Sequence, residues 1–338
     1  MNKIDHPIYI EHGFQIYTRP TEYLANFIRA NIAEGHHGCS AHGGGGLGKT
    51  SSLIFLTENV SRWLVDEVKR PIGVAARMTM PAGIRRSDRA FWVAVNQRLK
   101  LPSNARLDPG TAIERLVGYM SDRCGQAKQR RMVLFIDNAQ RITDAEFHYL
   151  EDLDTRMSEE GLSLFLVLMR QSDAQGIDIG DDWRERPSHT VRRWFMDTTA
   201  FRPLVGIAEV THALARYDRS AFWPTPDMPF SRFFAKEAFD AGWTLASEAA
   251  KIDAAVKQLR KHAKLPPSNE WPMATFSLCV RNLLEIASRE KPFQGFSEDQ
   301  ILRALNASGY VRLECVRAKV AMPASLQRVE APLMLDAA

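Results

Sequence analysis

The chain has 338 residues, of which 45% are hydrophobic and 25% charged, so it can bury a sizeable core and is too apolar for a disordered protein. It has no apolar run of about 18 residues, and polar residues interrupt the first thirty, which argues against a membrane span or a signal peptide and predicts a cytoplasmic location. The net charge of +4 permits contact with nucleic acid without requiring it.

The four cysteines lie far apart and form no C-x-x-C pair. This spacing argues against a disulfide framework and against a zinc site made of cysteines. We expect each of them to be a small buried hydrophobic residue: Cys39, Cys124, Cys279 and Cys315.

Apolar residues at helical spacing predict a leading helix over 22–33, and a weak strand follows over 37–41. After a glycine-rich loop, the pattern predicts a helix over 49–64. A mostly buried strand over 72–80 comes next and ends before Pro81. These segments form one strand-loop-helix-strand unit.

Two capping-box patterns of the S/T-x-x-E type predict further helices, one at Thr111 and Glu114 and one at Thr143 and Glu146. Each precedes a nearly continuous apolar strand, at 132–136 and at 162–169. Apolar strands that alternate with helices are typical of a parallel sheet covered on both faces, so the sequence predicts an α/β fold.

Beyond about residue 203 the strand signal fades, and helical patterns follow over 206–215, 233–264, 274–288 and 297–308. Proline-rich breaks separate them at 223–230 and 265–272. We therefore expect an all-helical lid after the sheet. The predicted domains are a helical lead-in over 1–35, the sheet domain over 36–205, the lid over 206–318 and a tail over 319–338.

The loop that precedes the helix over 49–64 matches the pattern G-x-x-x-x-G-K-[ST]. Glycines let backbone amides turn toward a β-phosphate, the helix N-terminus adds positive potential, and the lysine reaches the β- and γ-oxygens. The alternative to a phosphate-binding loop is a glycine-rich hinge. The alternative for Ser51 is an exposed position on the helix surface without contact to the ligand. The residues predicted to bind ATP are Gly43, Gly44, Gly45, Gly46, Leu47, Gly48, Lys49, Thr50 and Ser51.

An apolar strand ends in Asp137, where a P-loop protein needs an acidic group to orient Mg²⁺ together with Thr50. Hydrolytic members of this class usually have a glutamate next, but this chain has Asn138. An amide can orient a water molecule but cannot take its proton. Hydrolysis is then slow, uses another base, or is lost. Glu146 is a possible other base, with helix capping as the alternative role.

Further polar residues suit the γ-phosphate end of such a site. Gln171 follows the strand over 162–169 as a candidate sensor, or is a plain loop residue. Arg193, favoured over Arg192, is a candidate arginine finger for a neighbouring subunit in a region that also holds Arg184 and Arg186, or is solvated surface. Arg281 in the lid reaches back toward the phosphate or forms a structural salt bridge.

A basic cluster follows the strand over 72–80 and is a candidate contact for duplex DNA: Arg85, Arg86, Arg89 and Lys100. Such contacts are directed at phosphates and weaken with salt. The alternative is a solvated basic turn.

In order along the chain, Ala41-His42 with the P-loop, the segment 136–140, the segment 166–171 and Arg193-Trp194-Phe195 resemble AAA+ regulators of DNA transposition, the TnsC/TniB/IstB-like group. The later Phe222-Trp223-Pro224 and the helix through Arg281 extend the resemblance to residues 20–310. It implies a P-loop (ASCE/AAA+) sheet sandwiched by helices, with a helical lid.

The resemblance implies an ATP-bound homo-oligomer, a ring or helical filament, that assembles on duplex DNA and recruits a transposase and a target-selector protein. Asn138 departs from the group's usual glutamate and leaves turnover in question. The sequence also leaves open an ATPase of signalling or secretion, or a nucleotide-gated scaffold, that does not bind DNA.

Overall fold

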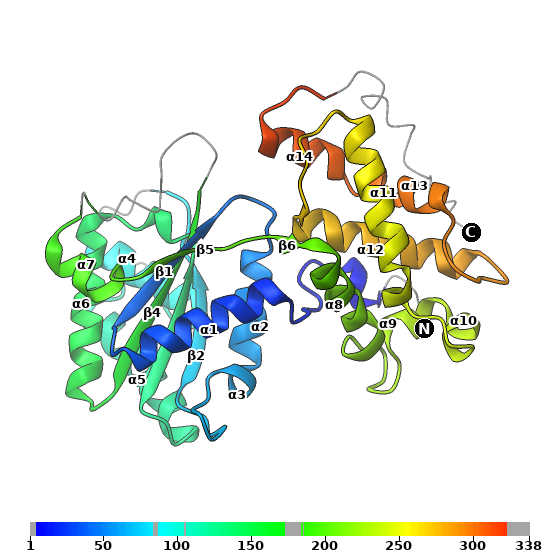
Figure 1. Cartoon of the computed structure of the whole chain (residues 1–338). Helices are drawn as coiled ribbons and strands as arrows, with labels where there is room; N and C mark the ends of the chain where they lie inside the picture. Colours follow the sequence, from blue (N-terminus) through cyan, green and yellow to red (C-terminus); the bar gives the residue numbers. More distant parts are fainter. Residues whose placement is uncertain (1–4, 84–86, 105, 173–183, 185, 323–338) are drawn as a thin grey trace. The chain divides into compact units, whose positions relative to one another are not determined.

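Five strands form one parallel sheet in the computed structural model, which describes residues 5–83, 87–104, 106–172, 184 and 186–322 (Figure 1). The sheet order is β2-β3-β4-β1-β5. The strand that carries the predicted sensor, β4, lies between β1 and β3, which end at the P-loop and at Asp137. The strands are β1 (Gly38–Gly43), β2 (Val74–Thr79), β3 (Arg131–Asp137), β4 (Ser163–Gln171) and β5 (Thr198–Ala200).

Helices cover both faces of this sheet, which confirms the predicted sandwich. Successive side chains of β3 show the two faces: Leu134 packs into the core shared with α4 to α7, whereas Phe135 lies against the Trp63 ring at 6.1 Å. The helices on the Trp63 side are α1 (Arg19–Ala33), α2 (Lys49–Glu58) and α3 (Val60–Trp63). Those on the other side are α4 (Asp88–Arg98), α5 (Pro109–Gln126), α6 (Asp144–Glu159) and α7 (Ser188–Trp194).

The predicted capping box at Thr111 and Glu114 is wrong. The cap is Asp108, whose carboxylate accepts from Thr111 N at 3.1 Å, and Pro109 begins α5, where its missing N–H costs nothing. Glu114 pairs instead with Arg156. The second predicted box is confirmed: Thr143 N donates to Glu146 Oε2 at 2.8 Å, and Glu146 N donates to the threonine hydroxyl.

Helix boundaries differ from the prediction at three further places. The helix expected over 49–64 divides into α2 and α3 at Asn59. α4 is the helix expected after the loop that follows the strand over 72–80, although no bounds were predicted for it. The helix expected over 233–264 is several short segments, because Gly242 takes a φ of 102° and Thr244 starts a new cap. Those segments are α9 (Phe230–Phe234), α10 (Lys236–Asp240), a 3-10 turn η5 (Leu245–Glu248) and α11 (Ala249–His262).

The rest of the C-terminal region is helical apart from a short antiparallel ribbon, β6 (Leu204–Val205) with β7 (Glu270–Trp271). The expected helices over 206–215, 274–288 and 297–308 are present. The elements are α8 (Gly206–Arg219), α12 (Met273–Arg289), α13 (Glu298–Ala307) and α14 (Tyr310–Ala318), of which α14 was not predicted. Short 3-10 turns stand at η2 (Pro7–Tyr9) and η3 (Ala139–Arg141).

The chain forms two compact units. The sheet unit is Pro20–Gly45 with Lys49–Arg202, and the helical unit is Met1–Arg19, Gly46–Gly48 and Pro203–Ala338. The division at 202 is close to the predicted one at 205. The predicted lead-in over 1–35 is shared between the two units, since α1 belongs with the sheet.

All four cysteines are buried and free, as predicted. In the helical unit, burial raises the pKa of the Cys279 thiol, as expected for a packed and unreactive side chain. Among the described residues, no helix is both long and apolar enough to cross a membrane. Of the predicted tail, residues 323–338 lie outside the described part of the chain.

Candidate nucleotide-binding site

The glycine-rich loop joins the end of β1 at Gly43 to the start of α2 at Lys49. Gly46 and Gly48 have φ angles of 74° and 95°, in the left-handed region that side chains disfavour. Two glycines within three positions therefore let this loop turn its amides, which is the geometry that cradles a phosphate. Leu47 between them is buried.

The Lys49 side chain is folded back over the loop. Its Nζ donates to the carbonyl oxygens of Gly43 at 2.7 Å and Gly44 at 2.6 Å, and only 8% of the residue is exposed. Lys49 is the first residue of α2, so its ammonium group lies close to the helix N-terminus and the loop amides. A positive group at this place stabilises an anionic ligand.

Thr50 and Asp137 come together from α2 and the end of β3. The Thr50 hydroxyl donates to Asp137 Oδ2 at 2.7 Å, and the backbone N–H of Asn138 donates to Oδ1 at 2.9 Å. The carboxylate is 3% exposed. A hydroxyl and a carboxylate side by side are oxygen ligands of the kind Mg²⁺ takes, so these residues fit the predicted metal.

Asn138 occupies a left-handed backbone position with φ 57° and ψ 38°. Asparagine tolerates this region better than most residues with side chains, so the local backbone favours the residue present. The position holds an amide rather than a base. Glu146 is 2% exposed and completes the α6 capping box, which matches the alternative role given to it above.

Gln171 lies beside the loop. β4 aligns it with Gly43 of β1, and its Nε2 lies 3.6 Å from the place a Cβ would take on Gly45. Its backbone N–H donates to Oε1 of Gln140 at 3.1 Å. Gln140 therefore joins the turn after Asp137 to the predicted sensor. Gln140 had no predicted role, because only the strand order brings it here.

The two candidate finger arginines differ in their surroundings. Arg193 Nη1 pairs with Asp154 Oδ2 at 2.7 Å, and His37 lies 3.4 Å from the same oxygen. Burial raises the pKa of Asp154, and the neighbouring His37 and Arg193 oppose the rise. Arg192, one residue earlier on α7, is exposed. A finger role for either one stays a prediction.

Other arginines of this region have local partners. Arg186 pairs with Asp144 at 3.0 Å and lies over the rings of Phe147 and Phe195. In the helical unit, Arg281 on α12 has its Nε 4.0 Å from Glu285. The salt-bridge interpretation expects such a contact. A role of Arg281 in nucleotide binding stays a prediction.

The predicted DNA residues do not form one cluster in the described chain. Arg85 and Arg86 lie outside the described residues. Arg89 is exposed in the first turn of α4, and Lys100 follows its last turn with φ 60°. These two residues are about 16 Å apart along the helix axis, since a helix rises about 1.5 Å per residue.

Lys100 nevertheless has basic neighbours. It lines a pocket of about 260 Å³ beside β2, α4 and α5, and the one acidic residue of that lining is Glu58. The Arg123 guanidinium is fixed by the carbonyl of Ala75 at 3.1 Å and by the Tyr119 ring. The pocket is suited to a phosphate group. Its basic residues are Arg77, Arg98, Lys100 and Arg123.

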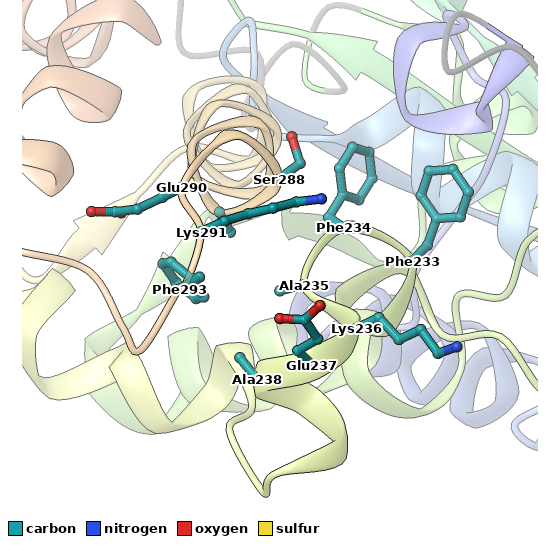
Figure 2. A pocket seen from close by; sticks show the side chains of 11 residues that line it. Phe233, Phe234, Ala235, Lys236, Glu237, Ala238, Ser288, Glu290, Lys291 and Phe293 are labelled. Atoms are coloured by element: carbon teal, nitrogen blue, oxygen red, sulfur yellow. The ribbon is translucent and has the colours of Figure 1, made fainter.

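A second pocket of about 310 Å³ lies in the helical unit, where α9, α10 and the end of α12 meet (Figure 2). Figure 2 shows Phe233, Phe234 and Phe293 around it, with Lys291 and Glu237 among the charged side chains. It contains none of the residues predicted for ATP or DNA.

Comparison with known proteins gives one family match. Residues 35–175 match the family model described as an AAA domain. No curated protein matches the chain. With the strand order and the loop geometry, the match shows a P-loop ATPase domain of the AAA+ fold. This part of the predicted resemblance is confirmed, and the transposition group within it stays a prediction.

Similar folds occur among solved structures at low identity. The Aeropyrum pernix ORC2 protein is 14% identical, with 86% of this chain and 68% of that one covered and a TM-score of 0.49. The A. pernix ORC1 protein in complex with DNA is 14% identical, with 88% of this chain and 67% of that one covered and a TM-score of 0.47. Domain III of the Thermotoga maritima replication initiation protein DnaA is 11% identical, with 92% of this chain and 99% of that one covered and a TM-score of 0.42.

Proposed function

We propose that this chain is an ATP-dependent, DNA-binding AAA+ regulator of DNA transposition that oligomerises on target DNA and recruits a transposase and a target selector. The observation that carries the ATP-dependent part is the meeting of Thr50 and Asp137 at 2.7 Å beside the buried Lys49. The transposition role rests on the sequence resemblance.

In this site Lys49 binds the β- and γ-phosphate oxygens, while Thr50 and Asp137 hold Mg²⁺, which neutralises phosphate charge when bound. Gln171 contacts the γ-phosphate from β4. Asn138 orients a water molecule and takes no proton from it, so turnover is slow. ATP then acts chiefly as an assembly switch, and Arg192 or Arg193 of a neighbouring subunit completes the site.

Duplex DNA is bound through its phosphates, with Lys100 and Arg89 among the contacts. The basic pocket around Lys100 supports this part. Since the contacts carry no base readout, we expect binding to be independent of sequence and to weaken steeply with salt.

An electrophoretic mobility shift on a random duplex at low salt, with ATP, ADP or no nucleotide, tests the proposal. We expect retardation with ATP only and none for Lys49→Ala. Lys100→Asn should weaken binding several-fold. Lys128→Asn is a matched control, because Lys128 is also exposed and also follows a helix with positive φ, 54°. Equal retardation without nucleotide would contradict the switch.

The transposition step has its own test. The ATP-bound complex on DNA should retain a transposase in co-sedimentation, and the Lys49→Ala protein should not. If ATP drives assembly while DNA binds in no nucleotide state, the second candidate is correct: a nucleotide-gated scaffold or a signalling or secretion ATPase without DNA. Asn138, which stands where hydrolytic members usually have a glutamate, favours that candidate's scaffold form.

A further inference from the structure

Two histidines and a glutamate meet on the surface where α6 and α7 pack together. His148 Nδ1 lies 3.4 Å from Glu151 Oε2, and His189 Nε2 lies 3.6 Å from Glu151 Oε1. One ligand atom from each residue lies within 4.8 Å of the other two. The imidazoles stack at 5.3 Å, and 57% of the His148 and 49% of the His189 side chain are exposed.

This spacing is close to that of ligands around a metal ion. Nitrogen and oxygen atoms bound to zinc at about 2.0–2.1 Å lie roughly 3.4 Å apart in a tetrahedron. His148 and Glu151 are three residues apart on α6 and so share one face of that helix. Glu151 Oε1 is itself buried and has no hydrogen-bond partner among the described residues, so a metal bound to it breaks no hydrogen bond of this oxygen.

We propose that His148, Glu151 and His189 bind a divalent transition-metal ion of the Zn²⁺ class, with water as a fourth ligand. Two imidazoles and one carboxylate suit zinc and its neighbours, whereas Mg²⁺ and Ca²⁺ take oxygen ligands. The site is separate from the Thr50 and Asp137 pair and goes beyond the proposed function. It requires no nucleotide.

The ion would bridge α6 to α7. Two ion pairs already join these helices or the segment just before α7, Arg186 with Asp144 and Arg193 with Asp154. Because α7 also carries Arg192 and leads into β5, a bound metal would restrain the helix that holds both candidate finger arginines. The site therefore offers a metal-dependent control of that helix.

Isothermal titration of Zn²⁺ into the full-length, tag-free and metal-stripped protein tests this. We expect one equivalent per chain. His189→Ala and Glu151→Gln should each weaken binding at least about tenfold, since each removes a direct ligand. His262→Ala, an exposed histidine at the end of α11, is the matched control and should bind as wild type. Wild-type affinity in the His189 and Glu151 variants would overturn the site.

Thermal unfolding supplies a second readout. Zn²⁺ should raise the Tm of wild type and of His262→Ala but not of His189→Ala, while all three should have similar Tm values without metal because the changes are on the surface. An equal Zn²⁺ shift in all three would also overturn the proposal. Lys49→Ala should keep the shift, so failure of nucleotide binding and failure of the metal site are distinguishable.

Discussion

Two carboxylates of this chain are equally buried, at 3% exposure, and are used in opposite ways: Asp137 in the sheet unit and Glu314 in the helical unit. Asp137 accepts from a hydroxyl and a backbone amide, both neutral. Glu314 forms an ion pair with Arg260 and another with Arg317 at 2.6 Å. Neutral donors leave the charge of Asp137 available for a cation, whereas the arginines neutralise Glu314.

The buried network around Glu314 is structural. Arg260 is 5% exposed and also donates to the Tyr310 hydroxyl at 2.9 Å, so it joins α11 to α14. Arg317 reaches from α14 to Glu270 of β7 at 2.6 Å. A carboxylate that binds a cation must not already be neutralised by arginines, which is why Asp137 and Glu314 have different partners.

The largest effect on stability should follow Glu314→Gln. It leaves Arg260 buried without its counter-charge, which costs about 3–5 kcal/mol of unfolding free energy. Asp137→Asn keeps the shape and hydrogen-bonding capacity of a side chain that has neutral partners, so its unfolding free energy should change far less. Urea unfolding of both variants measures the difference. Equal losses would show that Asp137 is also structural.

The order of the two variants should reverse when Mg-ATP binding is measured, with Asp137→Asn the more strongly affected. Asp137→Asn removes the proposed Mg²⁺ ligand and should weaken binding, whereas Glu314→Gln should bind as wild type at a temperature where it is folded. Weaker binding in both would mean that the helical unit's network supports the nucleotide site.

The next effect concerns a buried histidine in the helical unit. His6 is fully buried, with four aromatic rings at 4.3–4.9 Å, and its Nδ1 accepts from Ile8 N at 3.1 Å. Burial lowers the pKa of His6 to about 4 from its usual 6.5. The native state therefore keeps the ring neutral while the unfolded chain takes up a proton.

Because the unfolded state binds more protons between pH 6.5 and pH 4, acid destabilises the native state over that window. From pH 7.5 to pH 5 this group should cost about 2 kcal/mol. His6→Phe fills the same aromatic site and cannot titrate, so its unfolding free energy should fall less over this range by that amount. Parallel pH profiles for the two proteins would contradict this, because they would show that the pKa of His6 is the same in the native and the unfolded state.

The third effect tests turnover. Asn138→Glu supplies a base next to Asp137 and should raise the steady-state ATPase rate at least about tenfold, toward the range of general-base catalysis. The backbone is left-handed there, so glutamate costs about 1 kcal/mol of stability. Asn138→Gln has the same strain and no base, and is the matched control. A rate unchanged in both variants would place the limit elsewhere in the site.

Much of the sheet unit could be predicted, because apolar runs such as 132–136 and the glycine spacing of the loop are local signals. The start of α5 was missed because Thr111 and Asp108 both offer a cap, and only the position of Pro109 separates them. Gln140 and the cluster around Glu151 could not be found, since Gln171 and His189 lie far from them along the chain and meet them only through strand order and helix packing.

The smallest effect separates the two arginines of α7. Arg193→Ala leaves Asp154 with His37 alone in a site that is 7% exposed, and should cost about 1 kcal/mol of unfolding free energy. Arg192→Ala removes an exposed side chain and should change stability by less than about 0.5 kcal/mol. If Arg192 is the finger, its loss should lower the ATPase rate of the assembled protein and not of dilute monomers. If instead only Arg193→Ala lowers the ATPase rate, by more than its loss of stability explains, Arg193 is the finger. Its ion pair with Asp154 would then have to break on assembly.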